Sequence, residues 1–203
     1  QKAYDFFRDY GVKYIVIPWY DGSKLPGNAA WEETKKLFTR ISDEAKQNGM
    51  SLLYHNHDFE FTKVGDEYQY DIMFRDLNGH LDPEPDTCWM KHGGVNPAEY
   101  IRKYGSRINV VHLKDLTYVD GEGKPAYALI GDDGSEAKQG EAEKKTVVLV
   151  PLGRGINDFG SILEACSDNN VEYAIVEQDN FTGITPLEGM AESRRYLKDT
   201  FGL

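Results

Sequence analysis

Short apolar strands alternate with amphipathic helices along most of this 203-residue chain. One strand and the helix after it recur about every 30 to 40 residues, which is the length of a strand with its crossover helix. Two neighbouring parallel strands need such a crossover, and the crossover is nearly always right-handed. The alternation therefore predicts an α/β fold that is built on a mainly parallel sheet.

The individual elements follow from hydrophobic periodicity and from glycine, proline and capping residues. We expect strands at the apolar runs, which cover residues 13–17, 50–57, 86–90, 108–113 and 172–176. Helical periodicity covers residues 2–10, 31–48, 71–77, 97–104, 158–169 and 188–201. Between them we expect a hairpin over 59–70 and a compact turn over 82–85, both rich in turn residues. Residues 116–146 lack periodicity and predict a long loop or insertion within a single domain over 1–203.

Two architectures fit such an alternation, namely an open doubly wound sheet and a closed (β/α)8 barrel. A glycine-rich phosphate loop would favour the open sheet, but Gly153-Arg154-Gly155 lacks both the third glycine and the strand-to-helix context. A barrel keeps its functional side chains at the carboxyl ends of its strands. The polar residues of this chain cluster at the ends of its predicted strands, which favours the barrel.

The segment from Leu52 to Phe61 shows this pattern most clearly, because it begins as an apolar strand and ends among histidines and carboxylates. Alternation along a strand would place His55 and His57 on one face of the strand and Asn56 on the other. Two imidazoles on one face are typical of a metal site.

Three further predicted strands have ligand-type residues at their ends. Asp86 lies beside the predicted turn, His112 ends a second strand with Lys114 next to it, and Glu177 follows the last strand. Each residue alone also fits a structural role, since a single histidine at a strand end is more often hydrogen-bonded than metal-bound. Together they predict a mixed nitrogen and oxygen site for one divalent ion, either Mn, Co, Mg or Zn.

The motifs at these strand ends resemble the sugar phosphate isomerase/epimerase family of the xylose isomerase-like TIM barrel superfamily. They are Tyr54 to Phe61, Asp86-Thr87-Cys88-Trp89 with Gly93-Gly94, Arg107 leading to His112-Leu113-Lys114-Asp115, and Val176 to Asp179. The resemblance runs from about Gly11 to the carboxyl terminus. It implies a (β/α)8 barrel with one divalent metal ion on its axis.

The ligands of related ketose epimerases are Glu, Asp, His and Glu, which correspond here to His55, Asp86, His112 and Glu177. His55 departs from the glutamate of those relatives. Only about the last five β/α units have a counterpart in this chain, so the resemblance also implies that the first strands are missing. The alternatives are a circular rearrangement or a domain-swapped homodimer that completes the barrel.

The resemblance implies a metal-dependent sugar isomerase or epimerase that abstracts a proton next to the carbonyl of a keto sugar or sugar phosphate. Glu177 is the expected base, with His55 and Lys114 as further catalytic candidates, although Lys114 also fits a salt bridge to Asp115 or Glu177. Replacing a glutamate by His55 breaks the symmetry that epimerisation uses. A keto-sugar or inosose dehydratase, or a 3-keto-glycoside lyase, on the same metal site is therefore an alternative, and a non-catalytic sugar-binding protein is another.

Four further residues are candidates for contacts with a small carbohydrate substrate. His57 is expected to bind substrate or to support a ligand, and Glu60 to hold His57 or a sugar hydroxyl. Trp89 and Trp19 are expected to stack on a sugar ring, with core packing as the alternative.

Composition bears mainly on the partners of the protein. A net charge of −11 makes a nucleic acid an improbable partner and disfavours a metal-dependent DNA repair endonuclease on the same fold. No apolar run reaches the roughly 20 residues of a membrane span. No signal peptide is apparent, and the cysteines Cys88 and Cys166 are too few for a disulfide framework, so we expect a cytoplasmic protein.

Overall fold

The computed structural model describes residues 2–120 and 145–203, and the chain divides into two compact units. The first unit contains residues 1–111 and 162–174, and the second contains residues 112–161 and 175–203. Within the described residues, no helix is both long enough and apolar enough to cross a membrane.

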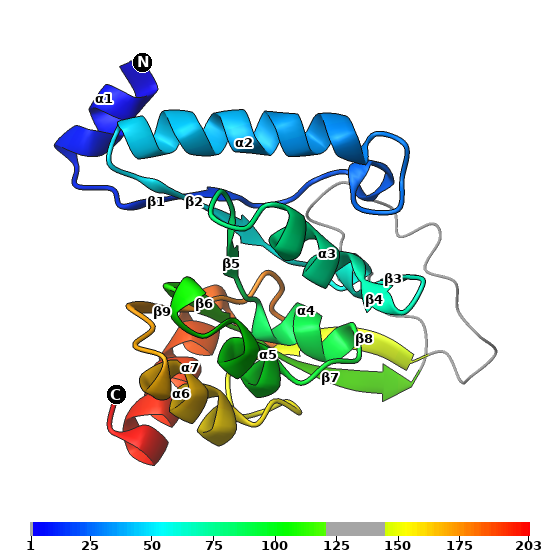
Figure 1. The fold of residues 1–203 in the computed structure, drawn as a ribbon. Coiled ribbons are helices and arrows are strands. Elements are labelled where there is room, and N and C mark those ends of the chain that lie inside the picture. Colours follow the sequence, from blue (N-terminus) through cyan, green and yellow to red (C-terminus); the bar gives the residue numbers. More distant parts are fainter. Residues whose placement is uncertain (1, 121–144) are drawn as a thin grey trace. The chain divides into compact units, whose positions relative to one another are not determined.

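A three-stranded parallel sheet forms the centre of the first unit. Its order is β1-β2-β5, and the strands are β1 (Tyr14–Ile17), β2 (Ser51–His55) and β5 (Asp82–Glu84). Ile17 pairs with Tyr54, and His55 pairs with Glu84, so β2 runs between the two other strands (Figure 1). The apolar run of β2 is buried, which fits the central strand of a parallel sheet.

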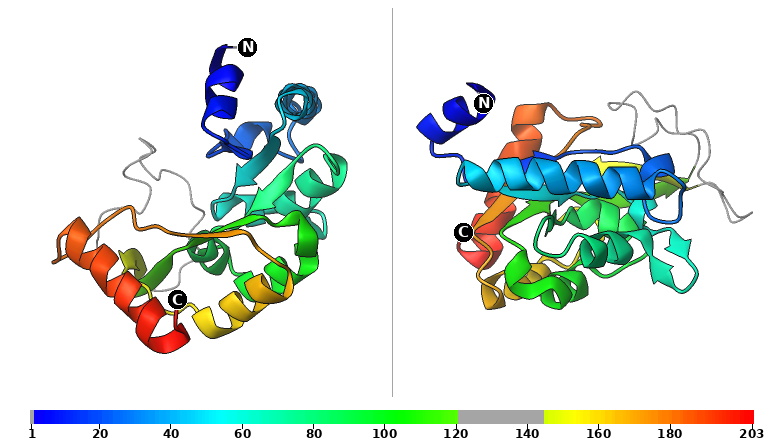
Figure 2. Two further views of the ribbon diagram at one scale, coloured as in Figure 1. Left: turned by 90° about the vertical axis from the view of Figure 1, so that its left-hand side faces the viewer. Right: turned by 45° about the horizontal axis from the view of Figure 1, so that its top comes forward.

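Helices and short turns connect these strands. The α-helices that begin in this unit are α1 (Lys2–Asp9), α2 (Trp31–Gln47), α3 (Gln69–Asp76), α4 (Thr87–His92) and α5 (Pro97–Tyr104). Short 3-10 turns are η1 (Gly22–Lys24), η2 (Phe59–Phe61) and η3 (Gly105–Arg107). Helix α2 lies along the sheet next to β2 and is seen end-on in the left view of Figure 2. Its buried residues Trp31 and Phe38 join a core that includes Tyr54 and Phe74.

The segment after β2 forms the predicted hairpin, with β3 (Lys63–Val64) antiparallel to β4 (Glu67–Tyr68). Further along, Asn96 caps α5 as expected, because its side-chain oxygen accepts from the backbone N–H groups of Ala98 and Glu99. Strand β6 (Val110–Leu113) then pairs with β9 (Tyr173–Val176), and α6 (Phe159–Asp168) precedes β9.

Two predicted elements are wrong in the first unit. Residues 82–85 do not form a turn, because β5 occupies Asp82–Glu84, and residues 87–90 belong to helix α4 rather than to a strand. Asp86 is the N-cap of α4, and its Oδ1 accepts from the N–H groups of Cys88 (2.8 Å) and Trp89 (3.0 Å). These capping hydrogen bonds stabilise a helix start that the apolar Cys-Trp-Met run obscures.

The second unit contains the antiparallel pair β7 (Asp115–Asp120) and β8 (Lys145–Val150) and the helix α7 (Pro186–Phe201). Thr185 and Glu188 form a capping box at the start of α7, which is two residues earlier than predicted. The prediction of a long loop over 116–146 is wrong at both ends, where β7 and β8 pair. Its central residues, 121–144, lie outside the described residues.

Candidate functional site

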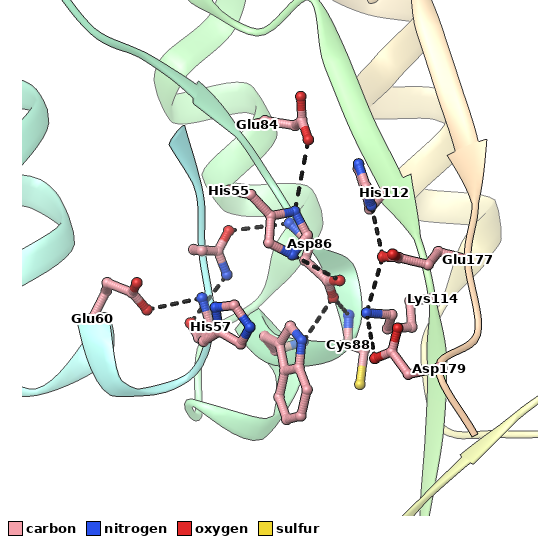
Figure 3. A network of polar contacts seen from close by, with 12 residues as sticks. His55, His57, Glu60, Glu84, Asp86, Cys88, His112, Lys114, Glu177 and Asp179 are labelled. Atoms are coloured by element: carbon pink, nitrogen blue, oxygen red, sulfur yellow. Dashed lines mark hydrogen bonds and ion pairs between the residues drawn. The ribbon is translucent and has the colours of Figure 1, made fainter. Parts of the chain in front are cut away.

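His55 is the last residue of β2, and its imidazole lies between two carboxylates of the first unit (Figure 3). Its Nε2 is 3.6 Å from Oδ2 of Asp86, and its Nδ1 is 3.7 Å from Oε1 of Glu84. His55 is only 7% exposed. Because Oδ1 of Asp86 caps α4, Oδ2 is the oxygen that faces His55.

The spacing of His55 and Asp86 suits a bound ion. A distance of 3.6 Å exceeds the 3.2 Å or so of an N–H···O hydrogen bond. Two atoms that each lie about 2.1 Å from one ion are separated by about 3 to 4 Å, depending on the angle between them. The pair can therefore accept a metal ion with little movement.

The backbone around this pair is fixed by polar side chains. Oδ1 of Asn56 accepts from the backbone N–H of Asp86 (3.0 Å), which connects the end of β2 to the start of α4. The two carboxyl oxygens of Glu60 accept from the Tyr54 hydroxyl (2.7 Å) and from the backbone N–H of His57 (2.8 Å). Glu60 is fully buried, and burial raises its pKa to about 8. Glu60 therefore holds the segment of His57, which is one of its two predicted roles.

The structure does not place His57 on the strand with His55. Strand β2 ends at His55, and the two imidazole planes are inclined by 77°. The ring of His57 stacks on Phe59, with centroids 5.6 Å apart, and lies 5.5 Å from the ring of Trp89. Trp89 is only 1% exposed and here packs in the core, whereas Trp19 is 40% exposed. Of the two tryptophans, Trp19 alone presents a surface to solvent.

In the second unit, the carboxylate of Glu177 follows β9 and accepts two hydrogen bonds (Figure 3). Its Oε2 is 2.7 Å from Nδ1 of His112 and 3.0 Å from Nζ of Lys114. Burial raises the pKa of Glu177, but the hydrogen bond and positive charges of His112 and Lys114 outweigh it and hold this pKa well below its usual range. Since an ionised carboxylate only accepts, His112 carries its proton on Nδ1 when neutral, and Nε2 retains the lone pair that a metal needs.

Lys114 is 2% exposed and lies between two carboxylates, Glu177 and Asp179. Its Nζ is 2.9 Å from Oδ2 of Asp179, so the ammonium charge is compensated twice. The predicted partner Glu177 is confirmed for this salt bridge. The other predicted partner, Asp115, instead accepts hydrogen bonds from the backbone.

Two acidic residues at these strand ends were not predicted as site residues. Glu84 lies on β5, where the sequence predicts a proline-rich turn instead of a strand. Asp179 lies two positions after Glu177, and this spacing in an extended segment places both carboxylates on one side, which is a signal that the sequence contained.

Of the four predicted ligands, His55 and Asp86 are buried, and His112 and Glu177 are partly buried. Each of the four offers one ligand atom of a type that binds divalent ions. Nitrogen and carboxylate oxygen donors suit Mn, Co, Mg or Zn and do not distinguish among them.

Comparisons with curated proteins identify inosose dehydratases as relatives. The chain is 28% identical to the inosose dehydratase of Clostridium perfringens over 98% of this chain and 69% of that protein. It is 26% identical to the inosose dehydratase of Geobacillus thermodenitrificans over 98% of this chain and 68% of that protein. The expectation of an isomerase or epimerase is therefore wrong, because these relatives carry the name of the dehydratase alternative.

Solved structures show the same fold at lower identity. A sugar phosphate isomerase/epimerase from Parabacteroides distasonis matches with a TM-score of 0.70 and 22% identity, over 98% of this chain and 63% of that one. A xylose isomerase-like TIM barrel protein from Mycobacterium smegmatis, solved in complex with magnesium, matches with a TM-score of 0.64 and 15% identity, over 98% of this chain and 64% of that one. The chain thus spans less than two thirds of the length of these structures.

A family model described as xylose isomerase-like TIM barrel matches residues 1–200, which is almost the whole chain. The order of strands and helices and the ligand-type residues at the strand ends agree with this match. The chain belongs to the xylose isomerase-like TIM barrel family.

Proposed function

We propose that this protein is a metal-assisted dehydratase that removes water from a cyclic polyhydroxy ketone of the inosose class. The observation that carries the proposal is the match to inosose dehydratases over 98% of the chain. The side chains at the strand ends are consistent with it. His55 and Asp86 can bind an ion, and Glu177 and Lys114 can act as a base and an acid.

We infer that His55, Asp86, His112 and Glu177 hold one divalent ion. Each of them lies near the carboxyl end of a strand, and in TIM barrels these ends supply the active site. When bound, the ion would polarise the carbonyl of the substrate and acidify the adjacent C–H group.

Glu177 and Lys114 would carry out the proton transfers of the elimination. Glu177 takes the proton from the carbon next to the carbonyl, the C–O bond of the β-hydroxyl breaks, and a carbon–carbon double bond forms. Lys114 gives a proton to the departing hydroxyl, which leaves as water. The proton on Glu177 then returns to Lys114 across their 3.0 Å contact, which restores both groups. The low pKa of Glu177 keeps it in the form that accepts a proton, at some cost in basicity.

The test is turnover of an inosose by the intact protein, supplied in turn with Mn, Co, Mg or Zn and followed by NMR and mass spectrometry. We expect a product that has lost one water, and no such product from Glu177→Gln. Glu164→Gln is the matched control, because Glu164 is exposed on α6 and forms a surface ion pair with Arg102. A product of unchanged mass, or binding of the inosose without turnover, would contradict the proposal.

A further inference from the structure

A buried carboxylate in the second unit organises the loop that follows β8. Oδ1 of Asp115 accepts from the backbone N–H groups of Leu116 (3.0 Å) and Asn157 (3.1 Å). Its Oδ2 accepts from those of Gly153 (3.0 Å) and Gly155 (2.8 Å). One side chain therefore satisfies four backbone donors, three of which belong to residues 151–157, hereafter the Asp115 loop.

The Asp115 loop is also hydrogen-bonded to the neighbours of Asp115. The side-chain amide of Asn157 donates to the carbonyl of Lys114 (2.9 Å), and the N–H of Ile156 donates to the carbonyl of Leu116 (2.9 Å). The fit is close at Gly155, where an added Cβ would lie 2.2 Å from the Leu116 carbonyl and 2.3 Å from Oδ1 of Asp115. The loop can therefore take this position only with glycine at residue 155.

Lys114 is the residue that these contacts surround. Its carbonyl is held by Asn157, its successor Asp115 is held by four N–H groups, and its ammonium reaches Glu177 and Asp179 (Figure 3). A buried carboxylate is tolerated only when it is hydrogen-bonded, so Asp115 and the N–H groups of the Asp115 loop hold each other in one position. A function that depends on the exact placement of Lys114 would account for it.

We propose that Asp115 is a positioning residue, which holds the Asp115 loop against residues 114–116 and so fixes the Lys114 ammonium at Glu177 and Asp179. The kinetic part of this inference rests on the proposed dehydratase function, in which Lys114 protonates the leaving hydroxyl. The effect of Asp115 on the position of Lys114 does not depend on that function and can be measured without turnover.

The first test is reductive methylation of the folded protein, in which modification of Lys114 is read by mass spectrometry of peptides after digestion. In the wild type Lys114 should be protected, since it is 2% exposed. Asp115→Asn, which replaces two accepting lone-pair sites by an NH2 group, should expose Lys114 to modification. Gly155→Ala should also expose Lys114, because the added methyl group displaces the loop from Asp115. This variant provides the test if Asp115→Asn does not fold.

Ser193→Ala is the matched control. The Ser193 hydroxyl is buried and accepts from the N–H of Leu152 (3.0 Å), so its loss loosens the same loop at a point away from Lys114. We expect Lys114 to stay protected in this variant.

The second test is kinetic. With an inosose as substrate, Asp115→Asn and Gly155→Ala should lower kcat by about 10- to 100-fold with little change in KM, because a small misplacement of a catalytic group costs about that much. Ser193→Ala should keep kcat near the wild-type value.

Unchanged protection of Lys114 in both variants would overturn the inference, as would an equal loss of protection in Ser193→Ala. A wild type that never turns over an inosose would refute the proposed function, while the modification experiment would still decide the role of Asp115.

Discussion

The buried Glu60 carboxyl should make the folded state lose stability as pH rises. Its pKa is raised from 4.5 to about 8 in the folded protein, chiefly by burial. Between these two pH values the unfolded chain has released the proton while the folded chain still holds it. The unfolded state then binds fewer protons, so the free energy of unfolding falls by about 1.36 kcal/mol per pH unit.

The window spans about 3.5 pH units, so the full effect of Glu60 is about 5 kcal/mol, and about 3 kcal/mol of it is already lost at pH 7. This is large beside the usual 5 to 15 kcal/mol of stability of a domain. Above pH 8 the carboxyl is ionised in both states, and its contribution no longer changes.

Glu60→Gln isolates this effect. A glutamine has nearly the same shape, and its oxygen can accept from the His57 N–H while its NH2 group donates to the Tyr54 hydroxyl, which can rotate to accept. The free energy of unfolding of the wild type should fall by about 4 to 5 kcal/mol relative to that of Glu60→Gln as the pH rises from 4.5 to 8. Urea unfolding followed by tryptophan fluorescence at several pH values measures this difference.

Glu99→Gln is a suitable control, because Glu99 is exposed on α5 and its substitution should leave the pH dependence unchanged. If the wild type and Glu60→Gln show parallel stability curves from pH 4.5 to pH 8, then Glu60 is not protonated in the folded state and the reasoning fails.

Three other changes should have defined effects. Removing divalent ions with a chelator should abolish inosose turnover, and adding back one of Mn, Co, Mg or Zn should restore it, as followed by product NMR. His112→Ala should lower both turnover and metal content, measured by elemental analysis, because it removes a proposed ligand. Arg107→Met should lower the free energy of unfolding by about 2 to 3 kcal/mol in urea titrations, since it leaves the carbonyls of Phe74 and Leu81 and the carboxylate of Asp82 without their charged donor.

Most of the fold could be predicted from local sequence signals. The long helix after Trp31, the capped helix after Asn96 and the apolar strand before His55 agree with the structure within a few residues. In these segments periodicity, capping and turn residues all favour the same element, and packing did not have to override any of them.

The segment from Asp82 to Met90 was mispredicted because tertiary contacts decide it. Pro83 suggested a turn, yet β5 is the edge strand of the β1-β2-β5 sheet, where a proline is tolerated. The apolar residues after Asp86 are buried, which fits a strand or a helix, and the cap at Asp86 selects the helix. This error also hid Glu84, whose role beside His55 depends on the pairing of β5 with β2.

The reaction was harder to predict than the site, because one barrel supports many reactions. The motifs predict the family correctly, but the epimerase reaction that the resemblance implies is contradicted by the dehydratase relatives. Epimerisation removes a proton from one face of a carbon and returns it to the other, which two equivalent glutamates can do. Elimination needs only one base and one acid for the leaving group. His55 in place of a glutamate removes the equivalence, while Glu177 and Lys114, the proposed base and acid, lie 3.0 Å apart. That substitution therefore favours a dehydratase over an epimerase, and the inosose dehydratases among the relatives agree with it.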